Sequence, residues 1–110
     1  MTTLRFAANW SQQQSDAIRA GEQLTIEYAA ERLPDCRASY RGQDAWNIAG
    51  YARFLPGGEV QSGAVAKQPL TIDVPADATH VELWFQNTDN TGCNAWDSRY
   101  GQNYRFEITR

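Results

Sequence analysis

Residues 81–86 read Val-Glu-Leu-Trp-Phe-Gln, and this pattern decides the fold class of the chain. Apolar side chains at the first, third and fifth positions alternate with Glu82, Trp84 and Gln86. A period of two is typical of a strand that buries one face. The same alternation recurs in residues 4–8, 24–29, 46–54, 70–74 and 104–108, and residues 60–66 read as a weaker, Gly-containing strand. Seven short strands separated by turns predict an all-β fold, an antiparallel, Ig-like β-sandwich.

Length and turn signals indicate one domain. The chain has 110 residues, which is enough to bury a core of its own, and we expect residues 1–110 to form a single sandwich. Pro56-Gly57-Gly58 predicts a hairpin, and the Gly-containing strand that follows is expected at a sheet edge. Only residues 11–20 could form a helical turn.

Composition excludes several classes of function. The net charge is −3 and acids and bases are interspersed, so no basic surface for nucleic acid is expected. No apolar run of about 18 residues exists to cross a membrane. Residues 1–5 lack the apolar core of a signal peptide. We expect a secreted or periplasmic domain of a longer precursor, with a cytoplasmic location as the alternative.

Cys36 and Cys93 are the two cysteines of the chain. Together with the single histidine, His80, they are too few for a four-ligand zinc site, and no metal or cofactor is expected. If each strand reverses direction, the loops that follow the second and sixth strands lie at the same pole of the sandwich. We therefore predict a Cys36–Cys93 disulfide; two free buried thiols are the alternative.

The segment before the last strand is rich in binding chemistry. Residues 93–104 read Cys-Asn-Ala-Trp-Asp-Ser-Arg-Tyr-Gly-Gln-Asn-Tyr. Aromatic rings stack on the apolar faces of sugars, and amides and carboxylates bond the hydroxyls, so apolar walls with a few polar groups suit a sugar site. The candidate ligand-binding residues of this segment are Asn94, Trp96, Asp97, Tyr100 and Asn103. As alternatives, Trp96 covers the end of the core, and Asp97 and Asn103 bond nearby backbone.

Two further aromatic residues are expected to face solvent from the strands. The alternation places Trp84 and Tyr51 on outward faces, and an outward tryptophan leaves a large apolar surface in water. If their strands are neighbours, the two rings form a flat patch that could bind sugar. The alternatives are a cross-strand pair that only stabilises the sheet and a contact with another domain.

The C-terminal quarter resembles family 21 carbohydrate-binding modules, which are starch- and glycogen-binding β-sandwiches. Their motif reads roughly Trp-Asp-Asn-Asn, then Gly, then Asn-Tyr before the last strand. This chain matches the motif at Trp96, Asp97, Gly101, Asn103 and Tyr104. Ser98 and Arg99 stand where the family usually has two asparagines. The resemblance implies glucan contacts from this loop and its aromatic residues.

Residues 24–109 are also similar to an uncharacterised group of bacterial β-sandwich domains that carry both cysteines, a likeness that implies no activity. We expect a non-catalytic carbohydrate-binding module, with an α-glucan or a related polysaccharide or oligosaccharide as its partner. The alternative is a structural or protein-interaction domain of a multidomain bacterial protein. An enzyme is not expected, because no nucleophile motif surrounds His80 and nothing pairs Glu82, Asp89 or Asp97 as glycosidase carboxylates.

Overall fold

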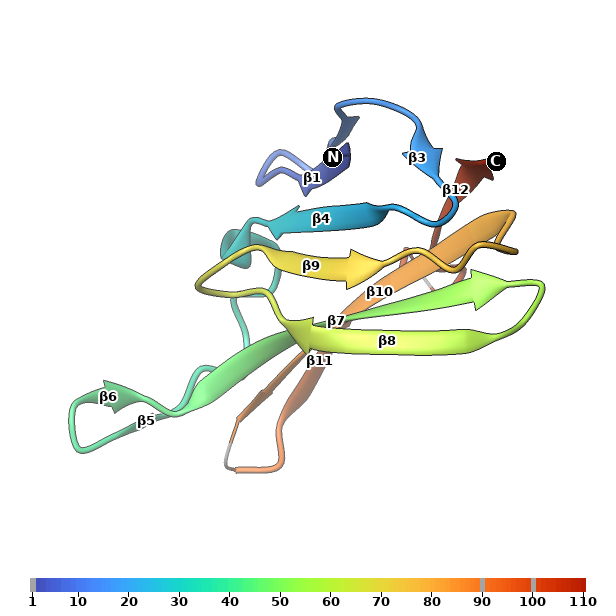
Figure 1. Ribbon diagram of the computed structural model, residues 1–110. Helices are drawn as coiled ribbons and strands as arrows, with labels where there is room; N and C mark the ends of the chain where they lie inside the picture. The colour runs from blue at the N-terminus through green and yellow to red at the C-terminus, as the bar shows by residue number, and fades with distance from the viewer. Residues whose placement is uncertain (1, 90, 100) are drawn as a thin grey trace.

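Two β-sheets pack face to face, as a computed structural model shows for residues 2–89, 91–99 and 101–110 (Figure 1). The first sheet has the order β2 (Gln12–Gln14), β1 (Thr2–Phe6), β4 (Gln23–Tyr28), β9 (Leu70–Asp73). The second has the order β3 (Ile18–Arg19), β12 (Tyr104–Thr109), β10 (His80–Asp89), β7 (Trp46–Leu55), β8 (Glu59–Ala64), with β11 (Asn94–Asp97) also paired to β10. A 3₁₀ turn, η1 (Ala30–Arg32), follows β4. The predicted β-sandwich is confirmed.

Each of the seven segments that the sequence predicts as a strand contains one in the structure. In β10, Val81, Leu83 and Phe85 are fully buried while the residues between them are partly exposed, as a half-buried strand requires. β10 and β7 pair antiparallel over ten residues each, so they form the central strand pair of the second sheet. The hairpin at residues 56–58 and the edge position of β8 also agree with the predictions.

The core is aromatic at its centre. Phe6 lies against Phe85 with ring centroids 4.8 Å apart, and Phe85 stacks on Tyr28 at 4.1 Å. Tyr104 contacts Phe6 edge-on at 5.2 Å. Gly50 faces Phe85 across β7 and β10, where a Cβ atom would lie only 3.2 Å from the phenyl ring. Four rings from both sheets therefore fill the space between β4, β10 and β12.

Strand directions differ in part from those predicted. β1 pairs with β4 in parallel, and so does β12 with β3. Residues 11–20 contain β2 and β3 in place of a helical turn. Leu4 of β1 pairs with β2, and the Ser15 N–H donates to the Thr3 carbonyl, so this segment is held against β1. β11 is a further short strand, within the segment that the sequence analysis treats as loop.

A two-stranded arm projects from the sandwich (Figure 1). It consists of β5 (Ser39–Tyr40) and β6 (Gln43–Asp44), joined by Arg41 and Gly42. Both turn residues have positive φ, 53° and 78°, as a tight two-residue hairpin prefers. Tyr40 near the tip is 64% exposed. The arm and the β10–β11 hairpin give the molecule an elongated shape, 48 × 24 × 24 Å.

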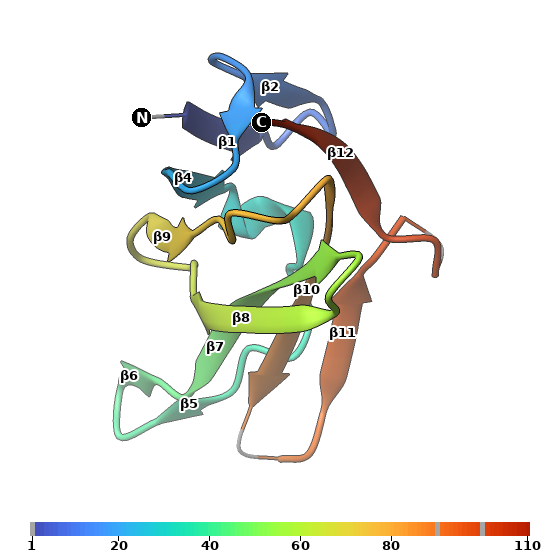
Figure 2. The ribbon, with the colours of Figure 1, turned by 45° about the vertical axis from the view of Figure 1, so that its right-hand side comes forward.

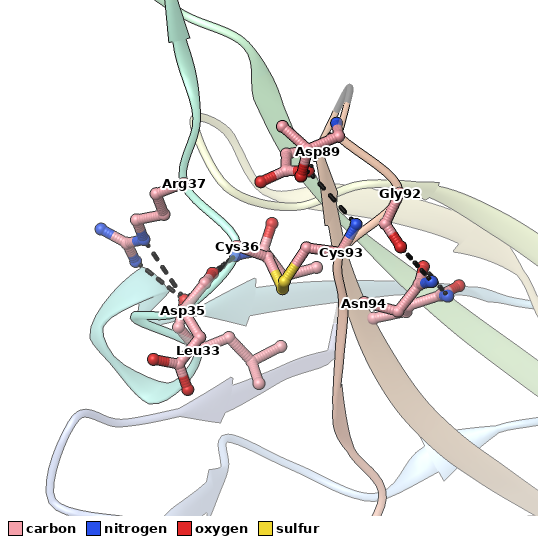
Figure 3. Close-up of a disulfide and its surroundings, with 11 residues drawn as sticks. Leu33, Asp35, Cys36, Arg37, Asp89, Gly92, Cys93 and Asn94 are labelled. Carbon is pink, nitrogen blue, oxygen red and sulfur yellow. Dashed lines mark hydrogen bonds between the residues drawn. A yellow bond between two sulfur atoms is a disulfide. The ribbon is translucent and has the colours of Figure 1, made fainter.

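The predicted disulfide between Cys36 and Cys93 is confirmed (Figure 3). It ties the segment leading into the arm to the β10–β11 hairpin. Next to it, the Asp89 carboxylate accepts hydrogen bonds from the hydroxyl and N–H of Thr91. These two hydrogen bonds hold the pKa of Asp89 below its ordinary value, and the bond from the hydroxyl has the larger effect. A disulfide of this kind indicates an oxidising compartment.

Gln61 joins the two sheets where their edges meet. Its amide Nε2 donates to the Asp73 carbonyl at 2.6 Å, and its Oε1 accepts the Asp73 N–H at 3.1 Å. The Gln61 amide thus makes the two hydrogen bonds to Asp73 that the backbone of a neighbouring strand would make. This side of the sandwich is closed by a side chain from β8 in place of a strand.

We predict that the double variant Cys36→Ala/Cys93→Ala folds but unfolds more easily. The bridge joins residues 57 positions apart, and a loop of this length constrains the unfolded chain by roughly 4 kcal/mol. Urea unfolding followed by tryptophan fluorescence measures the difference. Reduced wild type serves as the control and should unfold at the same midpoint as the variant. A midpoint unchanged from that of the oxidised wild type contradicts the prediction.

Candidate functional site

Three aromatic side chains share the outer face of the second sheet. The register places Trp84 opposite Tyr51 across β10 and β7, and Gln86 opposite Trp96 across β10 and β11. All four alternate with inward positions such as Phe85, so they point away from the core. Trp96 is therefore the diagonal neighbour of Trp84 on this face. We call Tyr51, Trp84 and Trp96 the aromatic face.

The three rings differ in their surroundings. Tyr51 and Trp84 lie parallel, with centroids 5.5 Å apart and planes inclined by 7°. The Arg53 guanidinium carbon lies 5.8 Å from the Trp84 ring centroid. Trp96 is 56% exposed, and among the described residues no other ring or cation stacks on it. The face thus combines a fixed ring pair with one largely uncovered indole.

Hydrogen-bonding side chains border the aromatic face on both sides. On one side, Thr88 lies opposite both Asn94 and Asn47. The Asn94 Oδ1 accepts a hydrogen bond from Gln86 Nε2 at 3.0 Å, and its Nδ2 donates to the Gly92 carbonyl. Amides therefore stand next to the rings, on strands and hairpins that fix their position.

On the other side of the rings the border is charged. Glu82 lies opposite Arg53 on β7 and Arg105 on β12. Its carboxylate accepts two hydrogen bonds from Arg53, from Nε at 3.1 Å and from Nη2 at 2.5 Å. Arg105 is exposed. This border supplies guanidinium donors close to Trp84.

Asp97, the residue after Trp96, points the other way, into the sandwich. Its Oδ2 accepts the Tyr28 hydroxyl at 2.7 Å and its Oδ1 accepts the Tyr104 hydroxyl at 2.6 Å. Arg32 from η1 places Nη1 3.3 Å from Oδ2, and both side chains of this ion pair are essentially inaccessible to solvent. We call Asp97, Tyr28, Tyr104 and Arg32 the buried network. With these partners, the Asp97 carboxylate is not free to bond an outside ligand.

The buried network also holds the turn between β1 and β2. Arg32 Nε donates to the Ala7 carbonyl and Nη2 donates to the Ser11 carbonyl, each at 2.8 Å. Trp10 lies in this turn, 57% exposed, with the Arg32 guanidinium carbon 5.0 Å from its ring centroid. One arginine therefore spans from the core carboxylate to a surface tryptophan.

Burial and the Asp97 carboxylate control the acidity of both tyrosines. Burial and, to a smaller extent, the hydrogen bond to Asp97 raise the pKa of Tyr104 from 10.0 to about 12. The same two causes raise the pKa of Tyr28 well above its ordinary value. Both hydroxyls are therefore hydrogen-bond donors to Asp97 throughout the neutral range.

A cleft lies beside β11 and the start of β12. Figure 2 shows these two strands at one side of the molecule. The cleft has a volume of about 270 Å³. Its walls are formed by Trp10, Trp96, Asp97, Ser98, Arg99 and Tyr104. Trp96 thus belongs both to the aromatic face and to this cleft, so the two are continuous. We call it the tryptophan cleft.

The structure brings together four of the seven residues proposed from sequence as ligand contacts. Tyr51, Trp84, Trp96 and Asn94 lie on one outer face, and Asp97 lies inside the sandwich. Asn103 has a φ of 63° and donates its N–H to the Ser98 carbonyl, in the turn before β12. Tyr100 lies outside the described residues.

Sequence reasoning missed Trp10 and Arg32. Trp10 lies in a segment without periodicity, so no pattern marked it as a surface ring. Arg32 precedes a proline-containing loop, and its partner Asp97 is 65 positions away, beyond any local spacing rule. A lone tryptophan among polar residues at 9–16 was the one available signal for this side of the cleft.

Within the described part of the chain, no three His, Cys, Asp or Glu side chains are grouped so as to hold a metal ion. Over the same residues there is no helix with the length and hydropathy needed to span a bilayer.

Comparisons with known proteins return one family. Residues 1–109 match the model of a family described as a family of unknown function, DUF6209. No curated protein and no solved structure matches the chain. The match covers the sandwich, both cysteines and the tryptophan cleft together.

We predict that Asp97→Ala lowers the free energy of unfolding by about 3–5 kcal/mol, because Arg32 keeps its buried charge without a partner. Urea unfolding measures the loss. Asp44→Ala removes an exposed carboxylate from the arm and should change stability by less than about 0.5 kcal/mol. Equal effects of the two substitutions contradict a structural role for the buried network.

We predict that alkali destabilises the protein through Tyr104. The folded chain holds the Tyr104 proton more tightly than the unfolded chain, since the pKa rises from 10.0 to about 12. Its stabilising contribution is complete below about pH 10 and is lost as pH rises to about 12. Unfolding measured across this range should show a steeper decline for wild type than for Tyr104→Phe. Parallel curves contradict the assignment.

Proposed function

The chain belongs to this family of unknown function, and we propose that it is a non-catalytic carbohydrate-binding module whose aromatic face takes up a polysaccharide. One observation carries the proposal. Tyr51, Trp84 and Trp96 share one outward sheet face with amide and guanidinium groups on both borders. Binding sites combine apolar walls with a few placed polar groups in this way.

The chemistry of a sugar chain fits this arrangement. A pyranose ring has apolar C–H faces and a rim of hydroxyls. Its faces would stack on the Trp84 and Trp96 rings, and its hydroxyls would exchange hydrogen bonds with Asn94, Gln86 and Arg53. Because these groups stand on paired strands, little conformational entropy is lost when the ligand binds.

The exposure of Trp96 favours a binding role over a purely structural one. A cross-strand ring pair such as Tyr51–Trp84 stabilises a sheet by itself. Trp96, 56% exposed and unstacked among the described residues, gains little from such packing. An exposed apolar patch with a polar rim commonly marks an interaction site.

The expected affinity is modest. A flat face buries only one side of a sugar, so we expect dissociation constants of about micromolar to millimolar. A multidomain parent protein would raise this through avidity. We propose a bacterial protein exported to the periplasm or the exterior, which agrees with the disulfide. The motif at residues 96–104 suggests an α-glucan as the first ligand to test.

A second candidate is a protein-interaction domain, favoured by the projecting arm. Tyr40 is 64% exposed, with the Arg41 guanidinium carbon 5.2 Å from its ring centroid. Tyrosine and arginine are enriched at protein–protein interfaces. In this case the arm and not the aromatic face would carry the function.

We predict that Trp84→Ala and Trp96→Ala each abolish retention of the protein in polysaccharide gels. Affinity electrophoresis in starch, glycogen, laminarin and xylan gels measures retention against a gel without polysaccharide. Both rings are at least partly exposed, so each variant should keep its fold, which circular dichroism checks.

Tyr40→Ala is the matched control, because it removes an exposed ring from the arm and leaves the aromatic face intact. It should be retarded as strongly as wild type. No retardation of wild type in any of these gels, or in a further gel that contains an acidic polysaccharide, would overturn the proposal. Binding lost only in Tyr40→Ala would transfer the function to the arm.

A further inference from the structure

The tryptophan cleft extends the aromatic face around the edge of the sheet. Trp96 is shared by both, and Trp10 also lines the cleft. Each indole is more than half exposed. A sugar chain lying on the aromatic face and passing over β11 would therefore place its next ring between two tryptophans.

The cleft has an uncompensated positive charge. Asp97 is the acid among its lining residues, and the buried network neutralises it through Arg32. Arg99 is exposed and also lines the cleft. Within the described residues its side chain has no ion pair and no hydrogen bond. A guanidinium that is not paired within the protein is available to a ligand.

Two of the residues that line the cleft have an uncommon backbone conformation. Trp10 has a φ of 70° and Arg99 a φ of 50°, in the left-handed region that costs free energy for every residue with a side chain. Glycine would adopt either conformation freely.

We propose that the tryptophan cleft binds a sugar ring that carries an acid group, with Arg99 pairing the acid and Trp10 and Trp96 flanking the ring. This rests on the proposed function, because the same glycan would run from the aromatic face into the cleft. A guanidinium matches two acid oxygens with two parallel hydrogen bonds. The ligand class is therefore an acidic polysaccharide, while a neutral one would use the aromatic face alone.

The test uses Arg99→Gly in the full chain. Glycine keeps the left-handed backbone without strain, so thermal stability should be equal to or above that of wild type. Arg41→Gly is the matched control: it removes the same charge from a residue with nearly the same φ, 53°, on the distant arm. Calorimetry and affinity electrophoresis would use polygalacturonate, carboxyl-reduced polygalacturonate, dextran sulfate and dextran.

We expect wild type and Arg41→Gly to bind an acidic probe, and Arg99→Gly to bind it about tenfold more weakly or worse, as for a lost hydrogen bond to a charged group. Carboxyl reduction should cause a similar loss, while dextran sulfate shows whether sulfate replaces carboxylate. Equal weakening in Arg41→Gly indicates attraction by net charge and overturns the inference.

The failure of this inference is distinct from the failure of the proposed function. If wild type binds neutral glucans through Trp84 and prefers no acidic probe, the cleft inference falls and the carbohydrate-binding proposal stands. If wild type binds neither neutral nor acidic polysaccharides, both fall together.

Discussion

The ion pair between Arg32 and Asp97 is the constraint on which the rest of the structure depends. Removing two charges from water is expensive unless hydrogen bonds satisfy the remaining donors and acceptors, and here both tyrosine hydroxyls and two backbone carbonyls do so. Tyr28 comes from the first sheet, and Asp97 and Tyr104 from the second. The pair therefore fixes how the sheets meet at one end of the sandwich.

The same interaction positions the surface on which the proposals rest. Asp97 and Trp96 are consecutive in β11, so a carboxylate held inside the sandwich turns the indole outside. Arg32 bonds the carbonyls of Ala7 and Ser11 and thereby shapes the turn that carries Trp10. The two walls of the tryptophan cleft, from opposite ends of the chain, are thus set by one buried carboxylate and one buried guanidinium.

The sequence predicted those features that repeat locally. Half-buried strands alternate between apolar and polar residues. This pattern predicted seven of the strands, the fold class and the outward positions of Trp84 and Tyr51. β11 was missed because one of its two inward residues is an aspartate, which breaks the apolar pattern. The parallel pairing of β1 with β4 was missed because sheet order depends on distant contacts. Arg32 and Trp10 became visible only when both sheets were in place.

Gln61 has a consequence for how the molecule behaves at high concentration. Exposed strand edges recruit strands of other chains, and natural sandwiches need some means of blocking them. By bonding the N–H and the carbonyl of Asp73, Gln61 occupies backbone groups at the end of β9 that an added strand would need. An uncharged side chain thus contributes to the protection of this edge, a role that lysines or prolines fill on many other sheet edges.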